Sequence, residues 1–133
     1  MSAETDLRKL LRELKPHLHR GEYVFVSLAP ERVAAIPPAS IIGSFREAEG
    51  ITLILSREAA DQRKLRYDYV AAWITLEVHS SLAAVGLTAA FATALAAEGI
   101  SGNVVAGFYH DHLFVGVEQA ERALEILRTL GKE

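Results

Sequence analysis

The sequence predicts an α+β protein built from two ferredoxin-like (βαββαβ-type) units with antiparallel sheets, packed side by side. Stretches with helical and with strand-like hydrophobic spacing alternate along the 133 residues, and the two halves share the order helix–strand–strand–helix. Half of the residues are hydrophobic, so a core is available, although one unit of about 65 residues would be marginal alone. We place the first unit at residues 1–66, with a proline-rich insertion, and the second at residues 67–133.

The first half begins with leucines at helical spacing over residues 7–18, where Pro16 should kink the helix or end it early. Gly21 then marks the change to a strand. Gly50 lies between two short extended runs, which predicts a hairpin. The elements expected in this half are a helix at 7–18, a strand at 23–28, a loop at 29–40, strands at 41–45 and 51–55, and a helix at 57–65.

The second half contains the clearest strand, residues 69–78, which alternates apolar residues on one face with Tyr69 and Trp73 on the other. A face that carries such aromatic residues often packs on another sheet or subunit. A helix should follow from Ser80 or Ser81 and end at Gly99. The remaining elements expected are a strand at 103–109, a tight turn at 110–112, a strand at 113–117 and a helix at 119–130.

Two pairs of segments carry the internal repeat. LKPHLHRGEYVFVSL matches the pattern of LAAEGISGNVVAGFY, with Gly21 opposite Gly102. EGITLILSREAADQ matches HDHLFVGVEQAERA, with Ala59 opposite Ala120. The two matches differ in offset, which we assign to the proline-rich insertion before Ile51. The identity is low, so this is a match of patterns.

Composition excludes several classes of function. The 14 basic and 17 acidic residues form no basic stripe, which argues against nucleic-acid binding. The absence of cysteine excludes disulfides, thiolate metal sites and cysteine nucleophiles. The charged, amphipathic N-terminus is not a secretory signal. Residues 78–97 carry no Asp, Glu, Lys or Arg, but their alanines and polar residues favour a buried helix over a membrane span. We therefore expect a cytoplasmic protein without a membrane partner.

The run from ITLEVHSSLAAVGLTA through GIS and NVVAG to HDHLFV resembles an ACT domain, and YVFVSL and REAEGITLIL fit the same pattern in the first half. The chain most resembles a small bacterial family of stand-alone tandem ACT proteins, similar to the regulatory ACT pairs of aspartate kinases. This resemblance implies a non-enzymatic regulatory module that binds a small molecule, an amino acid. It places the ligand at the loop between the first strand and first helix of the second unit, residues 79–86, with backbone of a neighbouring strand.

The residue chemistry agrees with that placement. The free N–H groups and positive dipole end of a helix suit a carboxylate, Gly86 allows close approach, and the ammonium needs an acidic acceptor. In the alternative interpretation, the serines only cap the helix and Gly86 only packs. The candidate ligand-binding residues are Ser80, Ser81, Leu82, Val85, Gly86, Leu87, Asn103, Val104, Glu47, Glu49, Thr52 and Asp111.

A histidine-based metal site is a weaker alternative. His79, His110 and His112 should meet at one sheet edge with Asp111, and three imidazoles with a carboxylate could hold Zn²⁺. His110 and His112 are two positions apart, however, and no His-Glu-x-x-His signature occurs. A polar turn that supports the ligand loop or a subunit contact explains the same residues.

A hydrolase triad of Ser80 or Ser81 with His79 and Asp111 is weaker still, because no nucleophile elbow is present. We therefore expect no catalytic residues and no cofactor. We expect a homodimer, because sheet edges are open, and an enzyme partner that the sequence does not identify. The remaining alternative is a pure interaction or oligomerisation module without a small ligand.

Overall fold

The computed structural model describes residues 7–77, 86–130 and 132. The chain divides into two compact units. The inserted unit is Gly21–Ala71, and the terminal unit combines Met1–Arg20 with Ala72–Glu133. The predicted limits of residues 1–66 and 67–133 follow the linear order of the chain, whereas compactness groups the N-terminal segment with the C-terminal half. The reason is that the segment after the first helix pairs with a strand more than fifty residues away.

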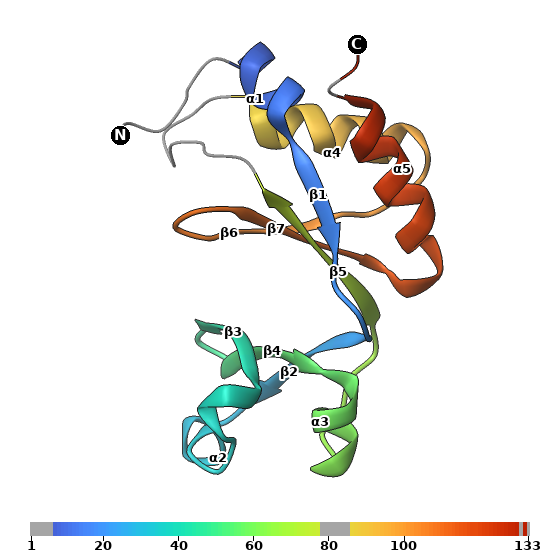
Figure 1. The fold of residues 1–133 in the computed structure, drawn as a ribbon. Coiled ribbons are helices and arrows are strands. Elements are labelled where there is room, and N and C mark those ends of the chain that lie inside the picture. Colours follow the sequence, from blue (N-terminus) through green and yellow to red (C-terminus); the bar gives the residue numbers. More distant parts are fainter. Residues whose placement is uncertain (1–6, 78–85, 131, 133) are drawn as a thin grey trace. The chain divides into compact units, whose positions relative to one another are not determined.

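The terminal unit contains the longest helices of the described chain (Figure 1). Strand β5 begins at the last residues of the inserted unit and continues through the terminal unit. The elements of the terminal unit are α1 (Leu7–Glu13), β1 (Lys15–Leu18), β5 (Val70–Glu77), α4 (Leu87–Ala97), β6 (Asn103–Ala106), β7 (Asp111–Gly116), a 3₁₀ turn η2 (Val117–Gln119) and α5 (Ala120–Leu130).

The sheet of the terminal unit has the strand order β1-β5-β7-β6. The β1 strand runs antiparallel to β5, from the pair Lys15–Glu77 to the pair Leu18–Ile74, and β6 runs antiparallel to β7. Read from β5, the elements follow the ferredoxin-like order strand–helix–strand–strand–helix, and the N-terminal β1 supplies the fourth strand. Helices α4 and α5 cover one face of this sheet (Figure 1).

The inserted unit repeats the arrangement with shorter helices. Its elements are β2 (Tyr23–Leu28), α2 (Pro30–Val33), a 3₁₀ turn η1 (Pro38–Ser40), β3 (Ile41–Arg46), β4 (Ile51–Ser56) and α3 (Arg57–Gln62). The strand order is β3-β4-β2, followed by the first residues of β5. Two ferredoxin-like antiparallel units confirm the predicted fold class.

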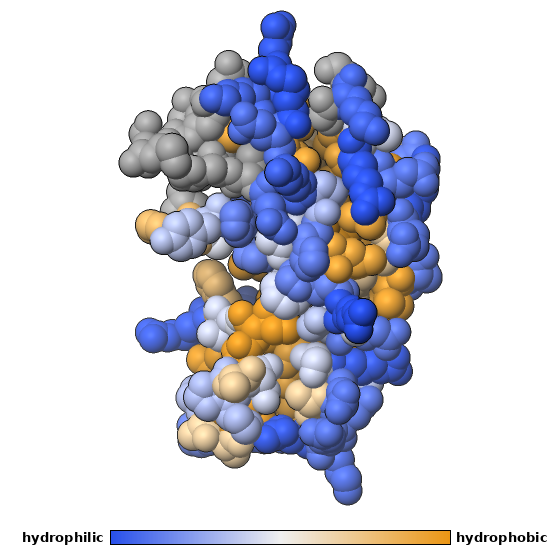
Figure 2. All heavy atoms as spheres, in the orientation of Figure 1, coloured by the Kyte–Doolittle hydropathy of each residue, from blue (hydrophilic) through white to orange (hydrophobic). Residues whose placement is uncertain are grey.

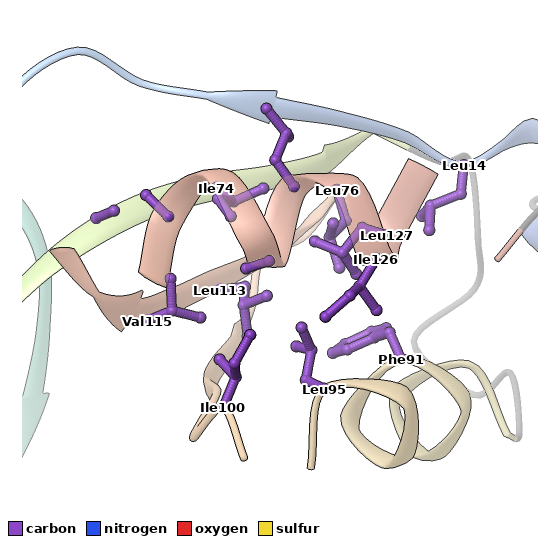
Figure 3. Close-up of a cluster of buried hydrophobic side chains, with 14 of the residues drawn as sticks. Leu14, Ile74, Leu76, Phe91, Leu95, Ile100, Leu113, Val115, Ile126 and Leu127 are labelled. Atoms are coloured by element: carbon purple, nitrogen blue, oxygen red, sulfur yellow. The ribbon is translucent and has the colours of Figure 1, made fainter. Parts of the chain in front are cut away.

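The core of the terminal unit lies between its sheet and its helices. Phe91 and Leu95 of α4 point toward Ile126 and Leu127 of α5, and all four are at most 8% exposed (Figure 3). The sheet contributes the apolar face that the alternation in β5 predicts, with Ala72, Ile74, Leu76, Leu113 and Val115. A separate cluster in the inserted unit contains Val24, Val26, Leu28, Ile36, Leu53, Leu55, Ala60 and Leu65.

Helix α5 has the amphipathic spacing that the sequence predicts. Ala123, Leu124 and Leu127 are buried, whereas Glu121 and Arg128 are exposed. In Figure 2 the surface over α5 shows hydrophilic residues with hydrophobic patches between them. Within the described residues, no helix is long and apolar enough to cross a membrane.

The predicted N-terminal helix over residues 7–18 is wrong in its second half. The helix ends at Glu13, and Lys15–Leu18 is a strand. Proline lacks the N–H that a helix interior requires and favours extended backbone before it, so Pro16 ends the helix and is tolerated in a short edge strand. Leu18 therefore packs against the core from a strand rather than from a helical stripe.

The internal repeat is real in topology, but only one predicted match is correct. The segment β4–α3 corresponds to β7–α5, as predicted. The match of β2 with β6 is wrong, because β2 is flanked by β4 and β5 whereas β6 lies at the end of the strand order. The counterpart of β2 is β5. Glycines before two unrelated strands produced the false match.

Candidate functional site

The predicted ligand loop lies mostly outside the described residues. Ser80, Ser81, Leu82 and Val85 fall there, as does His79 of the alternative metal site. The described part of the candidate loop is its last residue, Gly86, together with the helix that follows. Each of these predicted roles stays a prediction.

Helix α4 begins at Leu87, so the predicted start at Ser80 or Ser81 is wrong. Gly86 is its N-cap, with φ 97° and ψ −17°. This left-handed conformation interrupts a right-handed helix and favours glycine. The N–H of Ala90 bonds to the carbonyl of Gly86, so the amides at residues 87–89 precede the first intrahelical bond. The partial positive charge of the helix therefore lies at Leu87, one residue after the predicted loop.

The side chain of Leu7 lies beside Gly86. A Cβ atom on Gly86 would lie 3.2 Å from Leu7 Cδ2, which is a close contact. Leu7 packs against the hydrophobic core of the terminal unit, and Leu87 is 4% exposed within it. Gly86 therefore has a packing role, and the same junction leads into the first-turn amides on which the ligand interpretation depends.

The candidate residues on the β6–β7 hairpin lie apart from one another. Asn103 pairs with Phe114 and its Nδ2 donates to the Phe114 carbonyl at 3.4 Å. Asp111 pairs with Ala106 at the other end of the ladder, about 10 Å along the strand. Val104 is half-buried against the core. The structure thus does not join Asn103 and Asp111 in one small pocket.

The candidates Glu47, Glu49 and Thr52 belong to the inserted unit. Thr52 Oγ1 donates to Glu47 Oε1 at 2.5 Å, and backbone bonds between Glu47 and Gly50 close the hairpin. Glu49 is exposed at the turn. Glu47 therefore has a local role in its own hairpin, and its predicted contact with an ammonium group stays a prediction.

The predicted turn at residues 110–112 is displaced. The tight turn is 107–110, with the Gly107 N–H bonded to the His110 carbonyl at 2.8 Å, and Asp111 and His112 already belong to β7. Glycine is required at 107 because a Cβ would lie 2.8 Å from that carbonyl. His110 Nδ1 is buried and has no hydrogen-bond partner among the residues that the structure describes. Burial raises the pKa of the Asp111 carboxyl, while His112 and His110 oppose that shift.

A polar cluster lies on the face of the terminal sheet opposite α4 and α5. His19 stacks on Trp73 with ring centroids 3.6 Å apart, and its Nε2 is 2.7 Å from Thr75 Oγ1. Thr75 Oγ1 lies 3.1 Å from His112 Nδ1, to which the Trp73 indole N–H also donates at 3.2 Å. We call His19, Trp73, Thr75 and His112 the imidazole–indole cluster. Its side chains link β5 to β7 and to the residue after β1, in addition to the backbone bond from the His19 N–H to the Trp73 carbonyl at 2.9 Å.

Electrostatics favours neutral imidazoles in this cluster. Burial lowers the pKa of His19, with further lowering from His17 and His112 and opposition from Glu77. Burial also lowers the pKa of His112, where His110 adds to the effect and Asp111 opposes it. Because a neutral imidazole has one unprotonated nitrogen, it can accept the indole N–H.

The sequence interpretation missed this cluster. It placed residues 15–18 in a helix, so His17 and His19 were not aligned with β5. The available signal was Pro16, around which Lys15, His17 and His19 occupy every second position, at strand spacing. Among the residues that the structure describes, no group of three or more His, Asp or Glu side chains is arranged to hold a metal ion.

An open groove of about 220 Å³ lies between α4 and α5. Arg122 in its wall forms ion pairs with Glu98 at 2.5 Å and with Glu125 at 2.7 Å. These charges satisfy one another and are about half exposed, so the groove is a weaker candidate for a charged ligand than the start of α4.

The two ferredoxin-like units define a tandem α+β module of the kind that the sequence resemblance implies. Models of the ACT domain match residues 2–72 and residues 69–129. The chain therefore belongs to the ACT domain family. None of the curated proteins compared matches it.

Solved structures agree with this assignment. A Vibrio cholerae protein of unknown function, described as a possible transport protein, is 45% identical with a TM-score of 0.84, and the match covers 96% of this chain and 97% of that one. A protein from Agrobacterium tumefaciens is 22% identical with a TM-score of 0.65, covering 89% of each chain. The regulatory subunit of aspartate kinase from Thermus thermophilus is 12% identical with a TM-score of 0.62, covering 86% and 95%; these last two show similarity of fold alone.

Proposed function

We propose that this chain is a non-enzymatic regulatory module that binds an amino acid at the junction before α4. ACT domains are typical of small-molecule regulatory modules, and both halves of the chain match that family. The single observation that carries the proposed location is Gly86, whose left-handed backbone leads into a helix with three amides ahead of its first intrahelical bond.

The chemistry of this junction suits an amino-acid carboxylate. The first turn of α4 contains no acidic side chain, so the positive end of its dipole is not neutralised from within the helix. Ser80, Ser81, Leu82 and Val85 would complete the loop. Asp111 remains the candidate acceptor from the terminal unit, although its raised pKa makes it a weaker partner for an ammonium group than an ordinary carboxylate.

A thermal-shift screen tests this proposal. The wild-type protein is heated with each of the twenty amino acids at millimolar concentration, with glycerol and sodium chloride as controls. A ligand that binds only the folded state at 100 times its Kd stabilises by about 2.7 kcal/mol, which raises Tm by several degrees. At least one amino acid should do so. If none raises Tm, amino-acid binding is rejected.

The alternative is a module that acts only through protein contacts. The observation that favours it is an exposed aromatic pair at the β6–β7 turn, Phe108 at 78% and Tyr109 at 70% exposure. If this pair forms the expected homodimer contact, the F108S/Y109S double variant should lose self-association. Sedimentation in an analytical ultracentrifuge measures this. If that variant still binds an amino acid, the ligand-binding function is supported. If no amino acid raises Tm in the screen and the variant loses self-association, the protein-contact function is supported.

We also assign the module to the cytoplasm and expect its regulatory partner to be an enzyme of amino-acid metabolism. The similarity of fold to an aspartate kinase regulatory subunit supports this direction. Affinity capture with the purified chain, with and without the amino acid selected by the screen, tests whether an enzyme binds in a ligand-dependent way. Capture that is identical in both conditions would contradict ligand-dependent regulation.

A further inference from the structure

The contacts of His112 fix the protonation of its ring. The Trp73 indole nitrogen only donates, and it lies 3.2 Å from His112 Nδ1. That nitrogen must therefore carry a lone pair rather than a proton. In the neutral ring the proton then lies on Nε2.

The same constraint orients the neighbouring hydroxyl. Thr75 Oγ1 is 3.1 Å from His112 Nδ1 and 2.7 Å from His19 Nε2. Because Nδ1 of His112 can only accept, the Thr75 hydroxyl donates to it, and His19 Nε2–H donates to Thr75. Thr75 is 7% exposed, so its hydroxyl has little contact with water. Its hydroxyl thus links β5 to both histidines.

We propose that the imidazole–indole cluster is a pH sensor within the terminal unit. Proton uptake at His112 Nδ1 turns this atom from an acceptor into a donor. At mildly acidic pH its bond with the Trp73 indole N–H therefore breaks, and its bond with the Thr75 hydroxyl reverses direction. The loss of the indole bond loosens β7 from β5. This property is independent of the amino-acid site proposed above.

The surrounding groups make the cluster sensitive to charge. Among the described residues, β1 presents Lys15 and His17 beside His19, since these positions pair with Glu77 and Thr75 of β5. On its own strand and turn, His112 interacts electrostatically with Asp111 and His110, and Val105 of β6 pairs with it. The carboxylates are Glu77 beside His19 and Asp111 beside His112. They face several basic side chains, so each proton that a histidine takes up increases the repulsion between positive charges.

The direction of the pKa shifts agrees with the geometry. The pKa values of His19 and His112 both lie below the ordinary 6.5, with burial as the main cause. Both rings are therefore neutral at pH 7.5 and the bonds are intact. The transition falls below pH 6.5, within the range that a histidine sensor uses.

Nuclear magnetic resonance of the full chain tests the proposal, because Trp73 is the only tryptophan and gives one indole N–H signal. The signal is followed from pH 8 to pH 5 together with the ring nitrogens of His112. At pH 7.5 the proton of His112 should lie on Nε2. As the pH falls, protonation of Nδ1 and the shift of the indole signal should share one midpoint. A proton on Nδ1 at pH 7.5 would overturn the proposal without the use of any variant.

Two variants assign the step. In His112→Asn the amide oxygen lies near the place of Nδ1 and accepts the indole N–H without titrating, so the pH step of the indole signal should disappear. His17→Asn is the matched control, because His17 is exposed and its described ring contact is with the edge of His19; this variant should keep the step. A step that persists in His112→Asn, or that vanishes in His17→Asn alone, would overturn the assignment to His112.

Discussion

The indole N–H of Trp73 donates to Nδ1 of His112 across 3.2 Å, from the strand β5 to the strand β7. The same nitrogen lies 3.1 Å from the hydroxyl of Thr75. One ring atom is therefore shared by two side chains of the neighbouring strand. This arrangement couples the two side chains energetically and makes both dependent on the protonation of a single histidine.

A double-mutant cycle measures that coupling. Trp73→Phe removes the donor and Thr75→Val removes the hydroxyl, and each should lower the free energy of unfolding by about 0.5–1.5 kcal/mol at pH 7.5. Because both partners share His112 Nδ1, the double variant should depart from the sum by about 0.5 kcal/mol or more. Urea denaturation provides the measurement. Strict additivity would show that the two contacts are independent.

The stability of the protein should decrease as the pH falls below about 6.5. The pKa values of His19 and His112 are lower in the folded state than the ordinary 6.5, so the unfolded chain binds more protons in this range and unfolding becomes easier. The two neutral histidines contribute their full stabilisation above pH 6.5. This stabilisation is lost as the pH falls through their folded-state pKa values. Urea titrations at half-unit steps of pH measure this; a free energy that rises between pH 6.5 and 5.5 would contradict the shifts.

The effect of Asp111 on the free energy of unfolding should have the opposite pH dependence and should occur at lower pH. Burial raises its pKa above the ordinary 3.8, so the folded state holds this proton more strongly and the contribution of Asp111 improves as the pH falls through the raised pKa. Asp111 also raises the pKa of His112. Asp111→Asn should therefore move the midpoint of the indole step to lower pH. A midpoint that moves upward would exclude this electrostatic role.

The helical core of the terminal unit depends on Phe91. This side chain is fully buried between α4, α5 and the sheet (Figure 3), so Phe91→Ala should cost about 3–5 kcal/mol of stability through lost burial and a cavity. Phe45→Ala is the matched control, because Phe45 is 73% exposed, and should cost less than about 0.5 kcal/mol. Equal losses in denaturant unfolding would show that the described core is wrong.

Local sequence patterns predicted the elements whose signals lie within one segment. The strand at Tyr23–Leu28, the hairpin around Gly50 and the amphipathic helix α5 follow from strict periodicity and turn residues. The strand β1 was not predicted, because the leucine spacing favoured a helix. Its extended form depends on pairing with β5, which lies far along the chain.

The candidate sites were predictable to different degrees. The fold and the family could be inferred from the motifs of the second half. Gly86 was singled out because the lack of a side chain allows close approach, whereas its left-handed backbone was not predicted. The start of α4 was not predicted correctly, because serine is a preferred N-cap residue and the sequence offers Ser80 and Ser81 before Gly86. The imidazole–indole cluster required β1 beside β5. The helix predicted at residues 15–18 therefore prevented us from placing His19 beside Trp73.

The most direct test of the central claim is a calorimetric titration with the amino acid that raises Tm most in the screen. We compare the wild-type chain with Gly86→Val and with Gly99→Val, since both glycines have positive φ and lie at opposite ends of α4, but a Cβ at Gly99 meets no atom within 4 Å. We predict saturable binding that Gly86→Val abolishes and Gly99→Val retains. Binding that is absent from the wild-type chain, or unchanged in Gly86→Val, would contradict a ligand site at the start of α4.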